Sequence, residues 1–241
     1  MDDYATFTAY LPFILKGIPV TLLVAFLAMC VAIPVAFILA LGRMSPSRWL
    51  NMPAGFVIEL FRGSSSLVQL FWVFYVLPFF GVELPPIAAG VFVLGVNSGS
   101  YMSEIVRAGL NAVPAGQREA AVSLGFSPQY RFFRIILPQA LPLMIPPFGN
   151  AMITMLKFTS LVSLVTIQDL TFRANMVASS MGDSSSIYIL VILVYFGLSL
   201  LLALLGRFLE AVVNKRAGRT ASLFGSGSPS RIPPWALGRS G

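Results

Sequence analysis

The chain has 241 residues, of which 57% are hydrophobic and only 10% are charged, and its mean hydropathy is +0.84. So little polar surface could not coat a water-soluble globule of this length, which excludes a soluble enzyme and indicates an integral membrane protein of one domain. The net charge of +7 does not indicate nucleic-acid binding, because the basic residues lie between apolar runs and not along one face.

Two further features of the composition limit the chemistry. The chain has no histidine and a single cysteine, Cys30, which excludes His-ligated metals, histidine bases and a disulfide framework within the chain. It also has no Gly-x4-Gly-Lys-Ser/Thr loop for binding phosphates. We therefore expect no cofactor and no catalysis on this chain, and any ATP that drives it must bind to another protein.

Apolar runs along the chain predict about five transmembrane helices, since about 20 residues cross about 30 Å of hydrocarbon. The predicted spans are residues 18–41, 64–80, 87–110, 135–156 and 187–209. Two shorter apolar segments are predicted to lie at the interface or to re-enter the membrane, 54–61 and 161–170. Residues 1–16 precede the first span, and residues 213–241, rich in Ser, Gly, Pro and Arg, predict a disordered tail. The fold class is therefore all-α.

The distribution of basic residues predicts how the chain is oriented. Five spans put the two termini on opposite sides of the membrane, and Lys and Arg gather in cytoplasmic loops. With 12 of the 16 basic residues placed inside, the N-terminus lies outside and the C-terminal tail is cytoplasmic. The polar segment 113–134 then also faces the cytoplasm.

The third and fourth spans have unusual sequences. The third carries Asn97, Ser98 and Ser100, and spans tolerate such groups mainly where they face other helices or a water-filled path. It also carries Glu104 and Arg107, whose i, i+3 spacing predicts an ion pair, a spacing shared by Glu59 and Arg62. The fourth holds four prolines, which predicts a distorted helix: Pro138, Pro142, Pro146 and Pro147.

The polar segment 113–134 predicts a short helix followed by a sharp turn. Good helix formers fill residues 114–124, Gly125 is placed to end the helix, and Ser127 and Pro128 are placed to begin another. An alanine face edged by Arg118 and Glu119 suits insertion into a groove on a partner. The alternative is an ordinary loop between spans.

Several motifs in the chain resemble those of one transporter family. They include Glu119-Ala120-Ala121 with Gly125, Ile136-Leu137-Pro138-Gln139-Ala140, Lys16-Gly17-Ile18-Pro19, Leu67-Val68-Gln69-Leu70 and Tyr101-Met102-Ser103-Glu104. Together they resemble permease subunits of binding-protein-dependent ATP-binding-cassette (ABC) importers, in the polar-amino-acid subfamily. The resemblance covers nearly the whole chain.

The resemblance implies a type I importer fold over residues 17–212, in a multi-pass protein of the bacterial inner membrane. It implies a pore formed with a second permease subunit, two cytoplasmic ATPases that carry ATP and Mg, and an extracytoplasmic solute-binding protein. Nucleic acid is not among the expected partners. The residues that would dock into the ATPase are Arg118, Glu119, Ala120, Ala121 and Gly125.

One departure from the subfamily pattern bears on the solute. Lys157-Phe158-Thr159-Ser160-Leu161 stands where amino-acid permeases commonly have Lys-Asp-Thr-Ser-Leu, so an aromatic residue replaces a carboxylate. This argues against a cationic side chain neutralised there, although an aromatic face can hold a diffuse cation. The surrounding sequence is similar to permeases for ectoine-type compatible solutes. Alternatively, Phe158 only packs between helices, and Lys157 either pairs with a substrate carboxylate or extends to the interface.

The predicted substrate path combines these segments. Its residues are Gln69, Asn97, Ser98, Ser100, Lys157, Phe158, Thr159 and Ser160. Two other classes of function stay open at this point. One is an ion-coupled secondary transporter that relays through Glu104 and Lys157, and the other is a scaffold that only recruits a cytoplasmic protein.

Overall fold

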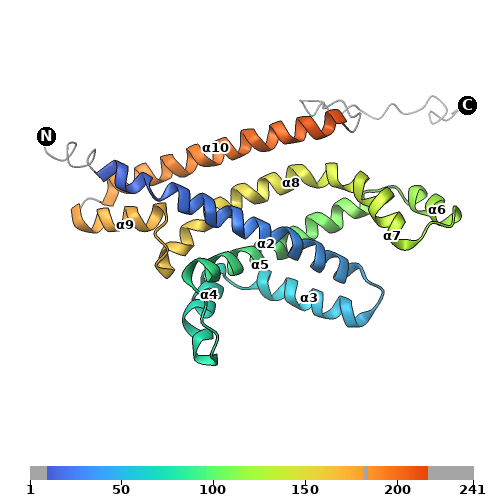
Figure 1. Ribbon diagram of the computed structural model, residues 1–241, viewed down its shortest axis with the longest axis horizontal. Helices are drawn as coiled ribbons and strands as arrows, with labels where there is room; N and C mark the ends of the chain where they lie inside the picture. The colour runs from blue at the N-terminus through green and yellow to red at the C-terminus, as the bar shows by residue number, and fades with distance from the viewer. Residues whose placement is uncertain (1–9, 182–183, 217–241) are drawn as a thin grey trace, which may run out of the picture.

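The computed structural model describes residues 10–181 and 184–216, and within these ranges the ordered elements are all helical. Four long helices run along the long axis of the molecule (Figure 1): α2 (Ile18–Met44), α5 (Pro86–Asn111), α8 (Leu137–Phe158) and α10 (Ser184–Arg216). The short helices α6 (Ala115–Ser123) and α7 (Pro128–Tyr130) lie at one end, and α9 (Leu170–Met181) lies at the other. The predicted all-α class is confirmed.

Small residues let α2 and α5 pack closely. The contact face of α2 is made of buried alanines, among them Ala28 and Ala32, and α5 faces it with Gly95 and Gly99. A Cβ atom at Gly95 would lie 2.7 Å from the Cβ of Val31, closer than two carbon atoms can approach. Small residues are the usual means by which membrane helices approach one another, because van der Waals packing drives their association.

The predicted span 64–80 is one arm of a bent helix pair. The other arm is α3 (Arg48–Gly63), so the short interfacial segment predicted at 54–61 belongs to a helix of 16 residues. After a bend of 104° the chain continues as α4 (Ser66–Phe71), the π-helical η1 (Trp72–Val76) and the 3₁₀-helical η2 (Leu77–Phe80). Ser64 and Ser65 are extended, which is why the helix does not run straight through.

Three described helical stretches are long and apolar enough to cross a membrane: Tyr10–Met44, Pro128–Val165 and Ser185–Val213. The bent pair α3 and α4–η2 would make a fourth. Helix α5 has the length, with 26 residues, but its polar residues keep it out of this group. The total of five membrane spans stays a prediction, as does the side of the membrane on which each terminus lies.

The helix α8 continues through three internal prolines, Pro142, Pro146 and Pro147. Irregular segments stand at both of its ends, the π-helical η3 (Arg131–Ile136) before it and the 3₁₀-helical η4 (Thr159–Val165) after it. The segment 161–170, predicted to be re-entrant or interfacial, is 3₁₀-helical up to Val165 and then turns through Thr166, in a left-handed conformation, to the start of α9. Helix α10 continues past its predicted end to Arg216, and the rest of the predicted tail, like residues 1–9, lies outside the described residues.

Candidate functional site

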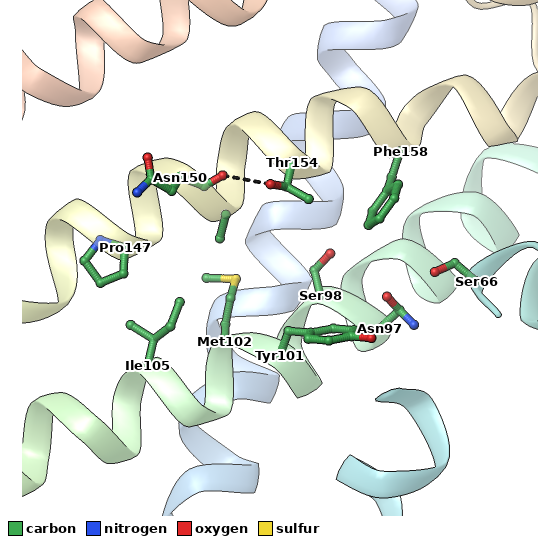
Figure 2. Close-up of a pocket in the computed structure, with 11 residues that line it drawn as sticks. Ser66, Asn97, Ser98, Tyr101, Met102, Ile105, Pro147, Asn150, Thr154 and Phe158 are labelled. Carbon is green, nitrogen blue, oxygen red and sulfur yellow. Dashed lines mark hydrogen bonds between the residues drawn. The ribbon is translucent and has the colours of Figure 1, made fainter. Parts of the chain in front are cut away.

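A cavity of about 450 Å³ lies between α5 and α8, next to the start of α4. Figure 2 shows side chains from both long helices converging on it, with Ser66 of α4 at one side. The lining residues are Ser66, Asn97, Ser98, Tyr101, Met102, Ile105, Pro147, Asn150, Ala151, Thr154 and Phe158. Its volume is in the range of pockets that hold small molecules.

The lining offers hydrogen bonds and apolar contact but no ionised side chain. The polar groups are three hydroxyls from Ser66, Ser98 and Thr154, the phenol of Tyr101, and the amides of Asn97 and Asn150. The Thr154 hydroxyl donates to the backbone carbonyl of Asn150, at 3.1 Å (Figure 2). A solute that is neutral overall would therefore meet partners for its polar atoms without having to compensate a fixed charge.

Asn97 connects this cavity to the bend between α3 and α4. It is 2% exposed, and its Nδ2 donates to the carbonyl of Phe61, at 3.0 Å, and to Oε1 of Gln69, at 3.1 Å. The Gln69 Nε2 donates to the same carbonyl, also at 3.0 Å. Gln69 does not line the cavity, so its predicted place on the substrate path is next to the wall and not within it.

The remaining residues of the predicted substrate path divide into three groups. Ser98 and Phe158 line the cavity with Asn97. Ser100 and Thr159 are fully buried and donate to carbonyls of nearby residues in the chain, those of Val96 and Leu156. Lys157 and Ser160 line a separate groove, of about 620 Å³, between α8 and α10. Lys157 and Phe158, neighbours in sequence, thus face different sides of α8.

The polar segment 113–134, called the coupling segment below because it is predicted to dock into an ATPase, has the predicted local structure. Gly125 follows α6 with a φ of +70° and donates its N–H to the Val122 carbonyl, a left-handed conformation that favours glycine. The hydroxyl of Ser127 accepts the N–H of Tyr130 and caps the next helix. This pair of signals explains why the segment forms a helix and a turn.

The surface of the coupling segment is apolar as well as charged. Ala121 is buried, and Arg118 donates to the Leu110 carbonyl, so these two side chains fasten α6 to the end of α5. Glu119 and Ala120 are exposed, as are the large side chains of Val122 (55%) and Leu124 (70%). Of the five predicted docking residues, the structure turns two toward the protein and leaves the other three accessible, namely Glu119, Ala120 and Gly125.

One of the two predicted ion pairs is confirmed. Arg107 Nη2 lies 2.6 Å from Glu104 Oε2, as the i, i+3 spacing predicts. The second prediction is wrong, because Glu59 and Arg62 form no ion pair within the part of the chain that the structure describes. Arg62 Nη1 instead lies 3.9 Å from Glu104 Oε1. Arg62 is at the end of α3, and the bend brings it over the Tyr101 ring of α5, at 5.4 Å.

A buried polar cluster at the α9 end was missed from the sequence. Asp169 is fully buried, its Oδ1 accepts the Phe172 N–H at 2.8 Å, and its Oδ2 accepts the Tyr195 hydroxyl at 3.5 Å. The adjacent Leu170 N–H donates to Thr21 Oγ1, at 3.1 Å. The loss of water around the carboxyl group raises the pKa of Asp169 to about 6, although these hydrogen bonds oppose the shift. The cluster ties α2, α9 and α10 together.

The polar cavity residues Ser66, Tyr101, Asn150 and Thr154 were also missed. Single polar residues in apolar runs carry no signal of which way they point until the helices are packed. Within residues 10–181 and 184–216, no group of three or more Cys, Asp or Glu side chains is placed to hold a metal ion.

Comparisons with known proteins all match the chain to membrane components of transport systems. A family described as "Binding-protein-dependent transport system inner membrane component" matches residues 32–215. A probable amino-acid ABC transporter permease protein, y4tF of Sinorhizobium fredii, is 42% identical over 189 residues, which cover 76% of this chain and 79% of that protein. The L-cystine transport system permease protein TcyB of Bacillus subtilis is 36% identical over 203 residues, which cover 84% of this chain and 87% of its own length. A crystal structure of an amino acid ABC transporter with histidines superimposes with a TM-score of 0.79 at 35% identity, over 86% of this chain and 97% of that one.

Proposed function

This chain belongs to the family of binding-protein-dependent transport system inner membrane components, among its amino-acid ABC transporter permeases, and we propose that it carries a small zwitterionic solute through an ATP-driven importer. The observation that carries this proposal is the cavity between α5 and α8, whose mainly apolar lining also offers hydroxyls and amides and no ionised side chain. Membership of the family makes the protein a multi-pass subunit of the inner membrane, and as a permease subunit it would leave ATP hydrolysis to a separate chain.

The lining of the cavity supports a solute without net charge. An amino acid with a neutral side chain, or a cyclic zwitterion of the ectoine type, has one carboxylate and one cationic group that largely compensate each other. Six polar residues offer hydrogen bonds to both groups, and Phe158 presents an aromatic side chain to the cationic one. A cation over such a ring gains about 0.5–2 kcal/mol. A solute with an additional charge would leave that charge desolvated and unpaired in the cavity.

The coupling segment supports a cytoplasmic ATPase as the source of energy. Val122 and Leu124 are exposed beside Glu119, a combination of apolar and charged surface that fits a groove on another protein. The chain continues from this segment through η3 directly into α8, which carries Asn150, Thr154 and Phe158 of the cavity. Movement of α6 by the ATPase would therefore reach the cavity through one continuous stretch of chain.

The partners follow from the family. An ATPase dimer would bind the coupling segments of two permease subunits and hold ATP and Mg, and an extracytoplasmic binding protein would deliver the solute. The cavity is only partly enclosed by this chain, so the second subunit, a copy of this chain or a homologue, would complete the path. Solute binding moves the alternating-access equilibrium only as far as one state binds it better than the other.

Competition for uptake tests the solute class. In cells with the complete transporter, uptake of labelled glutamine and of labelled ectoine is measured with unlabelled glutamine, ectoine, arginine and glutamate as competitors. We expect competition among the net-neutral solutes and little from arginine or glutamate. Strong competition by arginine alone would overturn the proposal for the cavity.

A variant of the coupling segment tests the energy source. Gly125→Asp places a side chain at a left-handed position on the exposed turn, and we expect it to abolish uptake while the protein still inserts. Gly116→Ala, on the same segment but with open space around it and without the left-handed backbone, is the matched control. Uptake that survives ATP depletion and collapses with the membrane potential would instead identify an ion-coupled transporter.

A further inference from the structure

The bend between α3 and α4 is held by side chains from other parts of the chain. A helix that ends leaves its last four carbonyls without partners, and within a membrane they cannot turn to water. Ser64 Oγ donates to the Leu60 carbonyl, at 2.6 Å, so the first of these carbonyls has a partner four residues further along the chain. The carbonyls of Phe61 and Arg62 accept hydrogen bonds from side chains of other helices, α4 and α5.

The Phe61 carbonyl accepts two amide groups at once. Asn97 Nδ2 of α5 and Gln69 Nε2 of α4 both donate to it at 3.0 Å, and Asn97 Nδ2 also donates to Gln69 Oε1 at 3.1 Å. Both Nδ2 hydrogens of Asn97 are thus engaged with the bend. Its Oδ1 is left to accept a hydrogen bond from a solute, because the same residue lines the cavity.

The Arg62 carbonyl is held by Tyr101 of α5. The Tyr101 hydroxyl donates to it at 3.2 Å, and the Arg62 guanidinium carbon lies 5.4 Å from the centre of the Tyr101 ring. Tyr101 also lines the cavity, on the same helix and one turn beyond Asn97 (Figure 2). The two α5 residues that fix the end of α3 are therefore also two residues that a solute would contact.

We propose that Asn97, Tyr101 and Gln69 form a clamp on the end of α3 through which solute in the cavity changes the angle between α3 and α4. This inference rests on the proposed function, since it takes the cavity as the solute site. A solute that forms a hydrogen bond with Asn97 or Tyr101 either strengthens the hydrogen bonds of the clamp or competes with them. It shifts the equilibrium between two angles of the bend by the difference between its affinities for the two. Gln69 acts as a positioning residue only, because it holds the bend without lining the cavity.

The distance across the bend is the direct readout. Cys30, which is exposed, is first replaced by serine, and spin labels are attached at Phe56→Cys on α3 and Phe79→Cys on η2, both exposed positions. The labelled permease is reconstituted with its ATPase in lipid nanodiscs. The distance distribution is measured with and without saturating glutamine or ectoine, whose binding is measured in the same samples. We expect bound solute to shift the distribution.

Three variants separate the clamp from the solute site. Gln69→Ala should keep solute affinity within about twofold and KM unchanged, but lose the distance shift and lower the maximal uptake rate about three- to tenfold, as expected for the loss of hydrogen bonds. Thr154→Val, which lines the cavity outside the clamp, should weaken affinity and keep the shift at saturation. Gln168→Ala removes an exposed amide that accepts one hydrogen bond, from Arg173, and does not contact α3, and it should change neither quantity.

The outcomes are distinguishable. Saturating binding without any distance shift in the parent protein would overturn the inference and leave the proposed function standing. A shift that survives in Gln69→Ala would equally overturn the role of the clamp. Absence of binding by either solute would overturn the proposed solute site, and the inference with it.

Discussion

The packing of α2 against α5 yields a quantitative prediction for Gly99→Ala. A Cβ atom at Gly99 would lie 2.7 Å from Val35 Cγ1 and 2.9 Å from the Ala32 carbonyl oxygen. Carbon atoms pack best about 3.5–4.0 Å apart, so the helices must separate by about 1 Å or distort. Overpacking of this kind costs about 1–3 kcal/mol. The gain in helix propensity from replacing glycine with alanine, about 1 kcal/mol, partly offsets this cost.

The matched control is Gly197→Ala in α10. It gains the same propensity, but its added Cβ meets nothing within 4 Å. The difference between the two variants therefore isolates the cost of overpacking, and Gly99→Ala should be less stable than Gly197→Ala by about 1–3 kcal/mol. Unfolding of the purified protein in mixed micelles with increasing SDS, followed by circular dichroism, measures this difference. If Gly99→Ala is as stable as Gly197→Ala, the close approach of α2 and α5 is refuted.

Three further predictions concern Asp169, Gly125 and Glu104. The pKa of Asp169 is raised from 3.8 to about 6, so its contribution to stability is fully present below pH 3.8 and is lost as the pH rises through 6, a change of roughly 3 kcal/mol; Asp169→Asn should remove this part of the pH dependence of unfolding, and an unchanged profile would contradict the buried carboxyl group. Gly125→Ala should cost about 1–2 kcal/mol through its left-handed backbone alone, since nothing lies within 4 Å, whereas Gly125→Asn should cost less; equal thermal stabilities of the two variants would count against the strained turn. Glu104→Gln should lower stability by less than about 1 kcal/mol, because all three charged groups of its ion pairs are more than a third exposed, and a larger loss in the same SDS titration would show that the charges act as a buried network.

Local signals in the sequence were sufficient for the coupling segment. Gly125 ends α6 and Ser127 caps α7 because both effects act between residues a few positions apart. The ion pair of Glu104 with Arg107 is of the same kind, since one helical turn brings the two side chains together. The pairing of Glu59 with Arg62 failed because a carboxylate from another helix reaches Arg62.

For the cavity, local signals in the sequence predicted some of the lining residues and not others. Asn97, Ser98 and Phe158 were predicted to line the substrate path and do line the cavity, because polar or aromatic residues at unusual positions stand out in the sequence. Lys157 directly precedes Phe158 and yet lines a different groove, since consecutive residues of a helix point about 100° apart. Asp169 lay next to an apolar run and gave no signal, because the Tyr195 hydroxyl that donates to it comes from another helix, α10.

The sequence by itself determined that this chain is a helical membrane protein, and that the segment 113–134 is polar between apolar spans. Those conclusions depend on composition and on interactions within a few residues, and both can be counted along the chain. Only the tertiary structure decided that Asn97 and Tyr101 hold the end of α3 while lining the cavity, and that Lys157 faces away from it. The physical reason is that the direction of a side chain becomes a contact only when the crossing of two helices is fixed, here by the small residues between α2 and α5.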